Sequence, residues 1–143
     1  IALNIAKNFK SQLKAFIGIA SAPEFTEKLM WKKFPKKIKK ILNEKKIVEI
    51  KNDYGSTYPI TKNLIDNGRK NKIFSKLKLN LPSVLFHGTN DKSVPLIFSS
   101  KTLKLFRSLN KKIIKIKNGD HSLSRKSDIK KILKELTRLV NEI

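Results

Sequence analysis

Two kinds of hydrophobic pattern alternate along this chain. Short apolar segments next to Pro, Gly or Asn are typical of buried strands in a parallel sheet. Longer stretches with apolar residues at every third or fourth position are typical of helices. The pattern predicts strands at 15–22, 83–86 and 111–117, and helical segments at 1–9, 24–43 (broken at Pro35), 96–109 and 126–143. A further short helix is expected to follow Pro59 and to end near Gly68 or a few residues beyond it. This order predicts an α/β fold in one continuous unit.

The segment between the first two predicted strands carries its own signals. Residues 46–51 alternate between polar and apolar side chains, which predicts a strand or hairpin arm. Residues 52–55, Asn-Asp-Tyr-Gly, form a turn signal. No internal repeat and no low-complexity linker occurs in the sequence.

Composition narrows the possible chemistry. The absence of cysteine excludes a disulfide scaffold, a Cys-ligated metal and a cysteine nucleophile within these 143 residues. His87 and His121 are the only histidines, so a multi-histidine metal centre is excluded as well. No apolar run reaches the ~18 residues that a membrane span requires.

The net charge of +22 first suggests an anionic partner such as nucleic acid. However, 29 of the basic residues are Lys and only 4 are Arg, and the lysines are spread along the whole chain. Phosphate recognition favours the bidentate Arg fork. Lys, Ile and Asn are all abundant and all have A/T-rich codons, so codon bias accounts for the charge. We therefore favour a solvated lysine surface over a specific nucleic-acid site.

Two loops carry the residues that could perform chemistry. Asp91 follows the strand at 83–86 and precedes Pro95, and His121 follows the strand at 111–117. Because parallel strands gather catalytic groups beyond their carboxyl ends, we expect Asp91 and His121 at the same edge of the sheet. An Asp beside a His fixes the imidazole tautomer and stabilises the imidazolium that forms when His takes a proton.

Each of these residues also has an ordinary structural interpretation. Asp91 could simply form a turn or cap a helix, and Gly119-Asp120-His121 could be a plain loop. His87, at the end of a strand, is interpreted as structural. Asp120 is expected to shape its turn rather than to act as the acid.

At this point the sequence shows a family resemblance. The segment HGTNDKSVP at 87–95, followed by GDH at 119–121, resembles the end of an alpha/beta-hydrolase domain. The resemblance implies that Asp91 is the catalytic acid and His121 the catalytic base of a serine triad. Residues 1–9 resemble the helix after the nucleophile, and residues 18–25, GIASAPEF, resemble the next strand and the start of a lid. Within the superfamily, the chain looks most similar to the serine esterase and thioesterase group that includes the mitochondrial depalmitoylase and acyl-glucuronide esterase.

One part of the family pattern is missing. None of the five glycines brackets a serine as Gly-x-Ser-x-Gly, and neither Ser21 nor Ser122 has the context of a nucleophile. We therefore expect residues 1–143 to be the carboxyl-terminal half of a hydrolase domain that is inactive by itself. By the same resemblance, residues 23–80 could form a lid or cap insertion, where Trp31, Phe34 and Tyr54 could contact an acyl group.

The sequence thus leads to one main hypothesis and two rivals. The main hypothesis is a cytoplasmic serine hydrolase that cleaves a small-molecule ester or thioester through an acyl-serine, with no metal or organic cofactor, no specific nucleic acid and no transmembrane segment. The first rival is a non-catalytic basic module that binds nucleic acid or an anionic lipid surface. The second rival is a degenerate hydrolase-like subunit that acts by interaction.

Overall fold

A computed structural model describes residues 1–51 and 55–142 of the chain. These residues form two compact units. Unit 1 contains residues 1–23 and 73–143, and unit 2 contains residues 24–72. Each unit has its own hydrophobic core and is described by itself. Among the described residues, no helix is long and apolar enough to cross a membrane.

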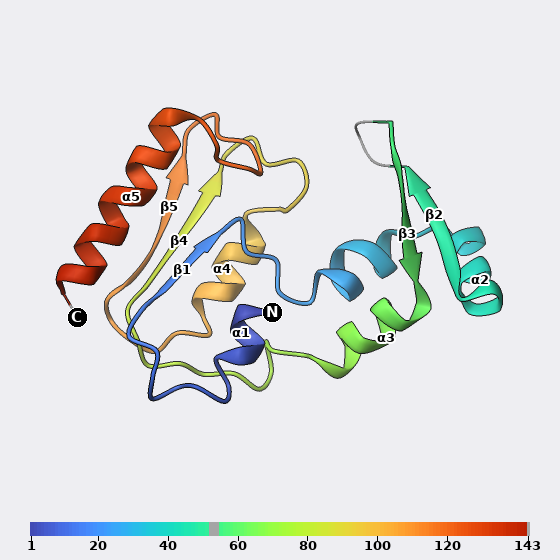
Figure 1. The fold of residues 1–143 in the computed structure, drawn as a ribbon, viewed down its shortest axis with the longest axis horizontal. Coiled ribbons are helices and arrows are strands. Elements are labelled where there is room, and N and C mark those ends of the chain that lie inside the picture. Colours follow the sequence, from blue (N-terminus) through green and yellow to red (C-terminus); the bar gives the residue numbers. More distant parts are fainter. Residues whose placement is uncertain (52–54, 143) are drawn as a thin grey trace. The chain divides into compact units, whose positions relative to one another are not determined.

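Unit 1 is built on a three-stranded parallel sheet. Its strands are β1 (Phe16–Ile19), β4 (Ser83–Gly88) and β5 (Lys111–Ile116), in the order β1-β4-β5. The three arrows run side by side in the same direction in Figure 1. All six residues of the central strand β4 are buried. The prediction of an α/β fold with about three parallel strands is therefore confirmed.

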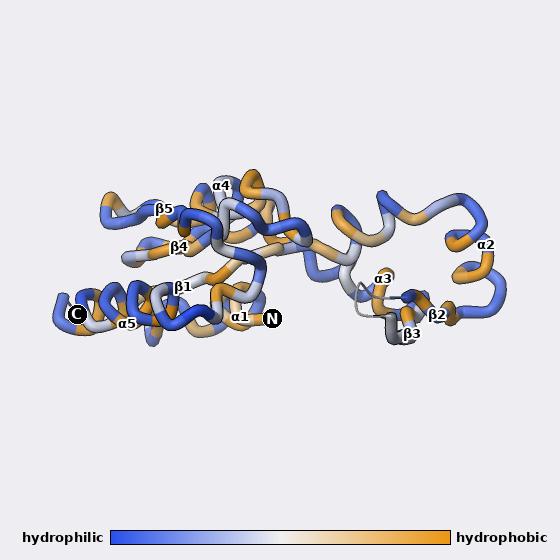
Figure 2. The backbone as a smooth tube through the Cα atoms, turned by 90° about the horizontal axis from the view of Figure 1, so that it is seen from above, coloured by the Kyte–Doolittle hydropathy of each residue, from blue (hydrophilic) through white to orange (hydrophobic). Residues whose placement is uncertain are grey.

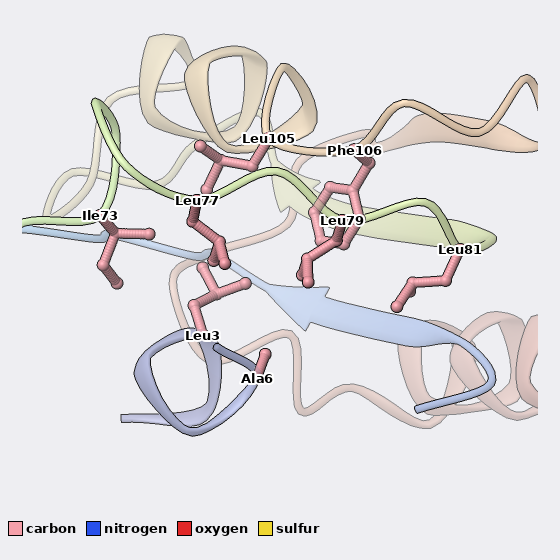
Figure 3. Close-up of a cluster of buried hydrophobic side chains, with 8 residues drawn as sticks. All are labelled: Leu3, Ala6, Ile73, Leu77, Leu79, Leu81, Leu105 and Phe106. Carbon is pink, nitrogen blue, oxygen red and sulfur yellow. The ribbon is translucent and has the colours of Figure 1, made fainter. Parts of the chain in front are cut away.

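Helices pack on this sheet through two apolar clusters. Unit 1 contains α1 (Ala2–Ile5), α4 (Ile97–Leu103) and α5 (Lys126–Asn141). Hydrophobic and hydrophilic positions alternate along α5 (Figure 2), and its Ile132 and Leu139 pack with Val84 and Phe86 of β4. A second cluster packs α1 against the segments before β4 and after α4 (Figure 3). Its buried members are Leu3, Ala6, Ile73, Leu77, Leu79, Leu81, Leu105 and Phe106.

Unit 2 combines short helices with a hairpin. Its core contains the buried residues Leu42, Ile60 and Ile65, against which Trp31 and Phe34 pack. The side chain of Thr61 caps the helix at Lys62–Lys70 by accepting a hydrogen bond from the backbone N–H of Leu64. The elements are a π-helical turn (Thr26–Met30), a 3₁₀ turn (Trp31–Lys33), α2 (Lys36–Lys45), β2 (Ile47–Lys51), β3 (Thr57–Thr61) and α3 (Lys62–Lys70).

Three predicted elements differ from the observed ones. The helix predicted at 96–109 ends at Leu103, because Leu105 and Phe106 enter the core and Phe106 forms a β-bridge with Leu79. The helix predicted at 1–9 is α-helical only over Ala2–Ile5. Its apolar residues are not all buried, since Ile5 and Phe9 are half exposed.

The third difference concerns Pro59. The helix predicted after Pro59 is present as α3, but it begins only at Lys62, because Pro59 lies inside β3. Proline is tolerated here because both strands of a two-stranded sheet are edge strands. The predicted strand at 46–51 is β2, which pairs antiparallel with β3. The turn predicted between them falls mostly on residues 52–54, which lie outside the described residues.

The burial pattern predicts which leucine in unit 1 matters for stability. Leu85 in β4 is fully buried, whereas Leu109 is fully exposed. We expect Leu85→Ala to lower the free energy of unfolding by about 2–5 kcal/mol, because it removes apolar contacts and leaves a cavity. Leu109→Ala, the matched control, should change it by less than about 0.5 kcal/mol. Urea unfolding followed by circular dichroism measures both. Equal effects would show that β4 is not the centre of the core.

Candidate active site

Asp91 lies in the loop that joins β4 to α4, residues 89–96, which we call the Asp91 loop. Its Oδ1 accepts hydrogen bonds from the backbone N–H groups of Ser93 (2.9 Å) and Val94 (2.8 Å). Asp91 therefore stabilises a turn through Oδ1, as its structural interpretation expected. Its other oxygen, Oδ2, makes neither of these hydrogen bonds.

His121 lies in the loop that joins β5 to α5, residues 117–125, which we call the His121 loop. Asp120 shapes this loop, because its Oδ1 accepts hydrogen bonds from the N–H groups of Ser122 (3.1 Å) and Leu123 (2.9 Å). The side chain of Leu123 is buried in the cluster beneath α5. The loop is thus anchored in the core on one side of His121.

The structure brings Asp91 and His121 together. The Nδ1 atom of His121 lies 2.9 Å from Oδ2 of Asp91. A carboxylate can only accept, so Nδ1 carries the proton and Nε2 has its lone pair available. The Asp91 side chain is 1% exposed and the His121 side chain 49% exposed. The pair therefore has a covered acid and a half-exposed base, whose Nε2 could take a proton from a substrate or nucleophile.

The surroundings of Asp91 keep it ionised. Burial alone would raise the pKa of its carboxyl group. The hydrogen bonds from the Val94 N–H and from His121, together with the latter's charge, outweigh burial and leave the pKa below its ordinary value. Asp91 is thus a carboxylate at neutral pH and can stabilise an imidazolium on His121.

Two glycines allow the two loops to touch. A Cβ atom on Gly88 would lie 2.2 Å from the carbonyl oxygen of Gly119, so no side chain fits between them. The backbones are also tied directly: Asn90 N–H donates to the Gly119 oxygen (2.8 Å), and Asn118 N–H donates to the Thr89 hydroxyl (2.8 Å). The sequence analysis placed these residues in the two candidate loops but gave them no role. The signal was present, because a glycine stands at or just after the end of each of the two predicted strands.

His87 is buried beside this contact and braces the Asp91 loop. Its Nε2 lies 2.9 Å from the Val94 carbonyl oxygen and its Nδ1 lies 2.8 Å from the Ser99 hydroxyl. Because a carbonyl only accepts, Nε2 is the protonated nitrogen. The same Nε2 is 3.6 Å from Oδ2 of Asp91. His87 therefore connects β4, the Asp91 loop and α4.

The sequence analysis also considered a metal centre and aromatic residues of a possible lid. Within the described residues, no group of three or more His, Cys, Asp or Glu side chains could hold a metal ion. Trp31 and Phe34 pack in the core of unit 2, where the Arg69 guanidinium lies 4.6 Å from the centre of the Trp31 ring. Tyr54 lies outside the described residues.

The class of fold follows from the sheet, its helices and the two loops. Parallel strands in the order β1-β4-β5, with the Asp91 loop and the His121 loop beyond β4 and β5, match part of an alpha/beta-hydrolase fold. The expected alpha/beta-hydrolase fold is therefore confirmed.

Several solved structures are similar to this chain. The chain is similar to a protein from Agrobacterium vitis S4 that is provisionally assigned as a hydrolase, with a TM-score of 0.89 and 23% identity over 96% of this chain and 56% of that one. It is similar to alpha/beta hydrolase domain-containing protein 10 from mouse, with a TM-score of 0.84 and 23% identity over 99% of this chain and 57% of that one. It is also similar to Est1E from Butyrivibrio proteoclasticus, with a TM-score of 0.68 and 16% identity over 98% of this chain and 56% of that one.

These similar structures show the fold of the chain and how much of a longer protein it corresponds to. The chain spans a little more than half the length of each of them. No protein-family model and no curated protein sequence matches the chain.

The site geometry predicts opposite tautomers for the two histidines. We expect neutral His121 to carry its proton on Nδ1, facing Asp91, and His87 to carry it on Nε2, facing the Val94 carbonyl. Long-range ¹H–¹⁵N NMR at pH 8.5, where imidazole is ordinarily neutral, distinguishes the two forms. His121→Ala assigns the signals. A His121 found mainly as the Nε2–H form would contradict the hydrogen bond to Asp91.

The depressed pKa of Asp91 predicts a pH-dependent contribution to stability. Because its folded pKa lies below that of the unfolded chain (~3.9), the ionised group stabilises the fold above about pH 4. This contribution is lost as the pH falls through the folded pKa. The stability difference between wild type and Asp91→Asn should thus shrink between pH 6 and pH 3 in urea unfolding. A difference that stays constant or grows on acidification would be inconsistent with the cause assigned here.

Proposed function

We propose that Asp91 and His121 are the acid and the base of a serine hydrolase that cleaves carboxylic ester or thioester bonds. The observation that carries this proposal is the 2.9 Å contact between Asp91 Oδ2 and His121 Nδ1, made between the loops that follow two neighbouring parallel strands. The similar folds of hydrolases and esterases support it.

In the proposed reaction, a serine hydroxyl attacks the substrate carbonyl while His121 Nε2 takes its proton. Asp91 holds the imidazole with Nε2 outward and stabilises the imidazolium. His121 then gives the proton to the leaving alcohol or thiol, and an acyl-serine remains. A water molecule then attacks the acyl-serine while His121 takes its proton. His121 returns this proton to the serine oxygen, and the carboxylic acid is released. The fixed Asp91 and its backbone donors need little rearrangement during these steps.

The serine nucleophile and the oxyanion donors are proposed to come from residues other than 1–143. The chain contains no Gly-x-Ser-x-Gly, the turn that presents the serine in this fold. We propose that the parent protein has such a turn shortly before Ile1, and that residues 1–143 alone do not hydrolyse esters by the triad mechanism. An in-frame Gly-x-Ser-x-Gly in the gene just upstream of Ile1 is the expected observation.

The size and nature of the substrate are a further part of the proposal. A small-molecule ester or thioester with an apolar acyl group fits a lid that carries aromatic residues. Unit 2 has such residues in Trp31 and Phe34, which pack against its core but stay partly exposed. We propose that unit 2, residues 24–72, is this lid, within the insertion expected at 23–80. No cofactor is required by the proposed chemistry.

The test measures turnover of p-nitrophenyl esters and acyl thioesters by the protein made from the complete gene. Asp91→Asn and His121→Ala should each lower kcat by about 10³–10⁴-fold, because either change removes proton transfer by a correctly oriented imidazole. Asp120→Asn is the matched control in the same loop, since an amide oxygen can still accept from Ser122 and Leu123. It should retain most of the activity.

Near-normal turnover in either Asp91→Asn or His121→Ala would refute the assignment. If the complete protein hydrolyses no ester or thioester but binds an anionic partner with an affinity that falls steeply with salt, the basic binding module would be the better account.

A further inference from the structure

The His121 loop contains two backbone conformations that side chains disfavour. Asn118 has a φ of 56° and Leu123 a φ of 47°, both in the left-handed region. Asn tolerates this region because its short polar side chain can bond locally, but Leu has no such compensation. His121 lies between these two positions. Strained conformations of this kind persist only where the surrounding structure fixes them.

Arg125 supplies a contact that fixes both ends of this loop. Arg125 is the last residue before α5, and its Nη2 donates to the carbonyl oxygen of Lys117, the first residue after β5, at 3.1 Å. The loop that carries His121 is therefore closed by one side chain. The Asp120 turn and the buried Leu123 side chain hold the loop from within, but neither joins its two ends.

Asp128 orients the Arg125 side chain. The Arg125 Nε and Nη2 atoms donate to the two carboxylate oxygens of Asp128 at 2.7 and 2.9 Å. The Asp128 side chain is 2% exposed, and the hydrogen bonds from Arg125 hold its pKa below the ordinary value despite burial. A bidentate pair with a covered, ionised partner leaves the guanidinium little freedom to rotate. The N–H of Nη2 that does not bind Asp128 then points to the carbonyl oxygen of Lys117.

We infer that Arg125, fixed by Asp128, is a positioning residue that closes the His121 loop and so keeps His121 Nδ1 against Asp91. This inference rests on the proposed function for its catalytic consequence, but the geometry that it describes can be measured separately. A lysine cannot replace Arg125, because a single ammonium group cannot bind both carboxylate oxygens in the plane and also reach the backbone carbonyl.

The test compares Arg125→Ala and Arg125→Lys with Arg138→Ala in the protein made from the complete gene. Arg138, within α5, is a matched control, because like Arg125 it pairs with carboxylates, at 2.9 Å from Glu135 and 2.5 Å from Glu142. Both Arg125 variants should lower kcat by about 10- to 100-fold with little change in KM, since a small displacement of the base disturbs the reaction more than substrate binding. Arg138→Ala should stay within about twofold of wild type.

A second readout reports the position of His121 directly. In both Arg125 variants, long-range ¹H–¹⁵N NMR should show His121 losing its preference for the Nδ1–H tautomer, whereas Arg138→Ala should keep it. Circular dichroism checks that each variant is folded, and if Arg125→Ala is not, Arg125→Lys decides by the same two readouts.

The inference is overturned if a folded Arg125 variant matches Arg138→Ala in kcat and keeps the Nδ1–H tautomer. His121→Ala separates this result from failure of the proposed function. If His121→Ala abolishes turnover while the Arg125 variants are normal, only the positioning role falls. If His121→Ala is fully active, the proposed function falls, and the tautomer alone then decides the role of Arg125.

Discussion

The close approach of Gly88 to Gly119 is the constraint on which the site depends. With a side chain on Gly88 the two backbones would have to separate, because a Cβ atom there would lie 2.2 Å from the Gly119 oxygen. The parallel pairing of β4 with β5 brings the loops to the same edge, and the contact between glycines sets how near they come. A hydrogen bond of 2.9 Å between Asp91 and His121 needs both conditions. A separation of even 1 Å would leave Asp91 buried and poorly paired, at a substantial cost in free energy.

The pattern of apolar positions was sufficient to predict the sheet, because a buried parallel strand such as β4 tolerates few polar residues. The same pattern was wrong where tertiary contacts override local periodicity. Leu105 and Phe106 fit a helical repeat, yet they end α4 because the backbone pairs with Leu79. The contact between Asp91 and His121 could be predicted from the sequence, because each residue follows a predicted strand. The role of Arg125 could not be predicted. Its i,i+3 spacing to Asp128 suggests an ordinary helical ion pair, and no sequence pattern shows that the same guanidinium reaches the Lys117 carbonyl oxygen.

Arginine and lysine side chains make different kinds of contact in this structure. Arg69 and Arg125 make specific contacts: Arg69 with Glu27 and Trp31, and Arg125 with Asp128 and Lys117. These contacts use the planar fork or face of the guanidinium, which lysine does not have. The far more numerous lysines include ion pairs such as Lys40–Glu44, in which both side chains are more than half exposed. Such pairs contribute little to stability.

The central claim is that Asp91 and His121 activate a serine supplied by the rest of a hydrolase. Its most direct test is labelling of the protein made from the complete gene with a fluorophosphonate, which reacts with serines activated by such a pair. The labelled residue is then located by mass spectrometry. The account predicts one labelled serine, in a Gly-x-Ser-x-Gly that precedes Ile1, and loss of the label in His121→Ala. Labelling that persists in His121→Ala, or that falls on Ser21 or Ser122, would contradict it.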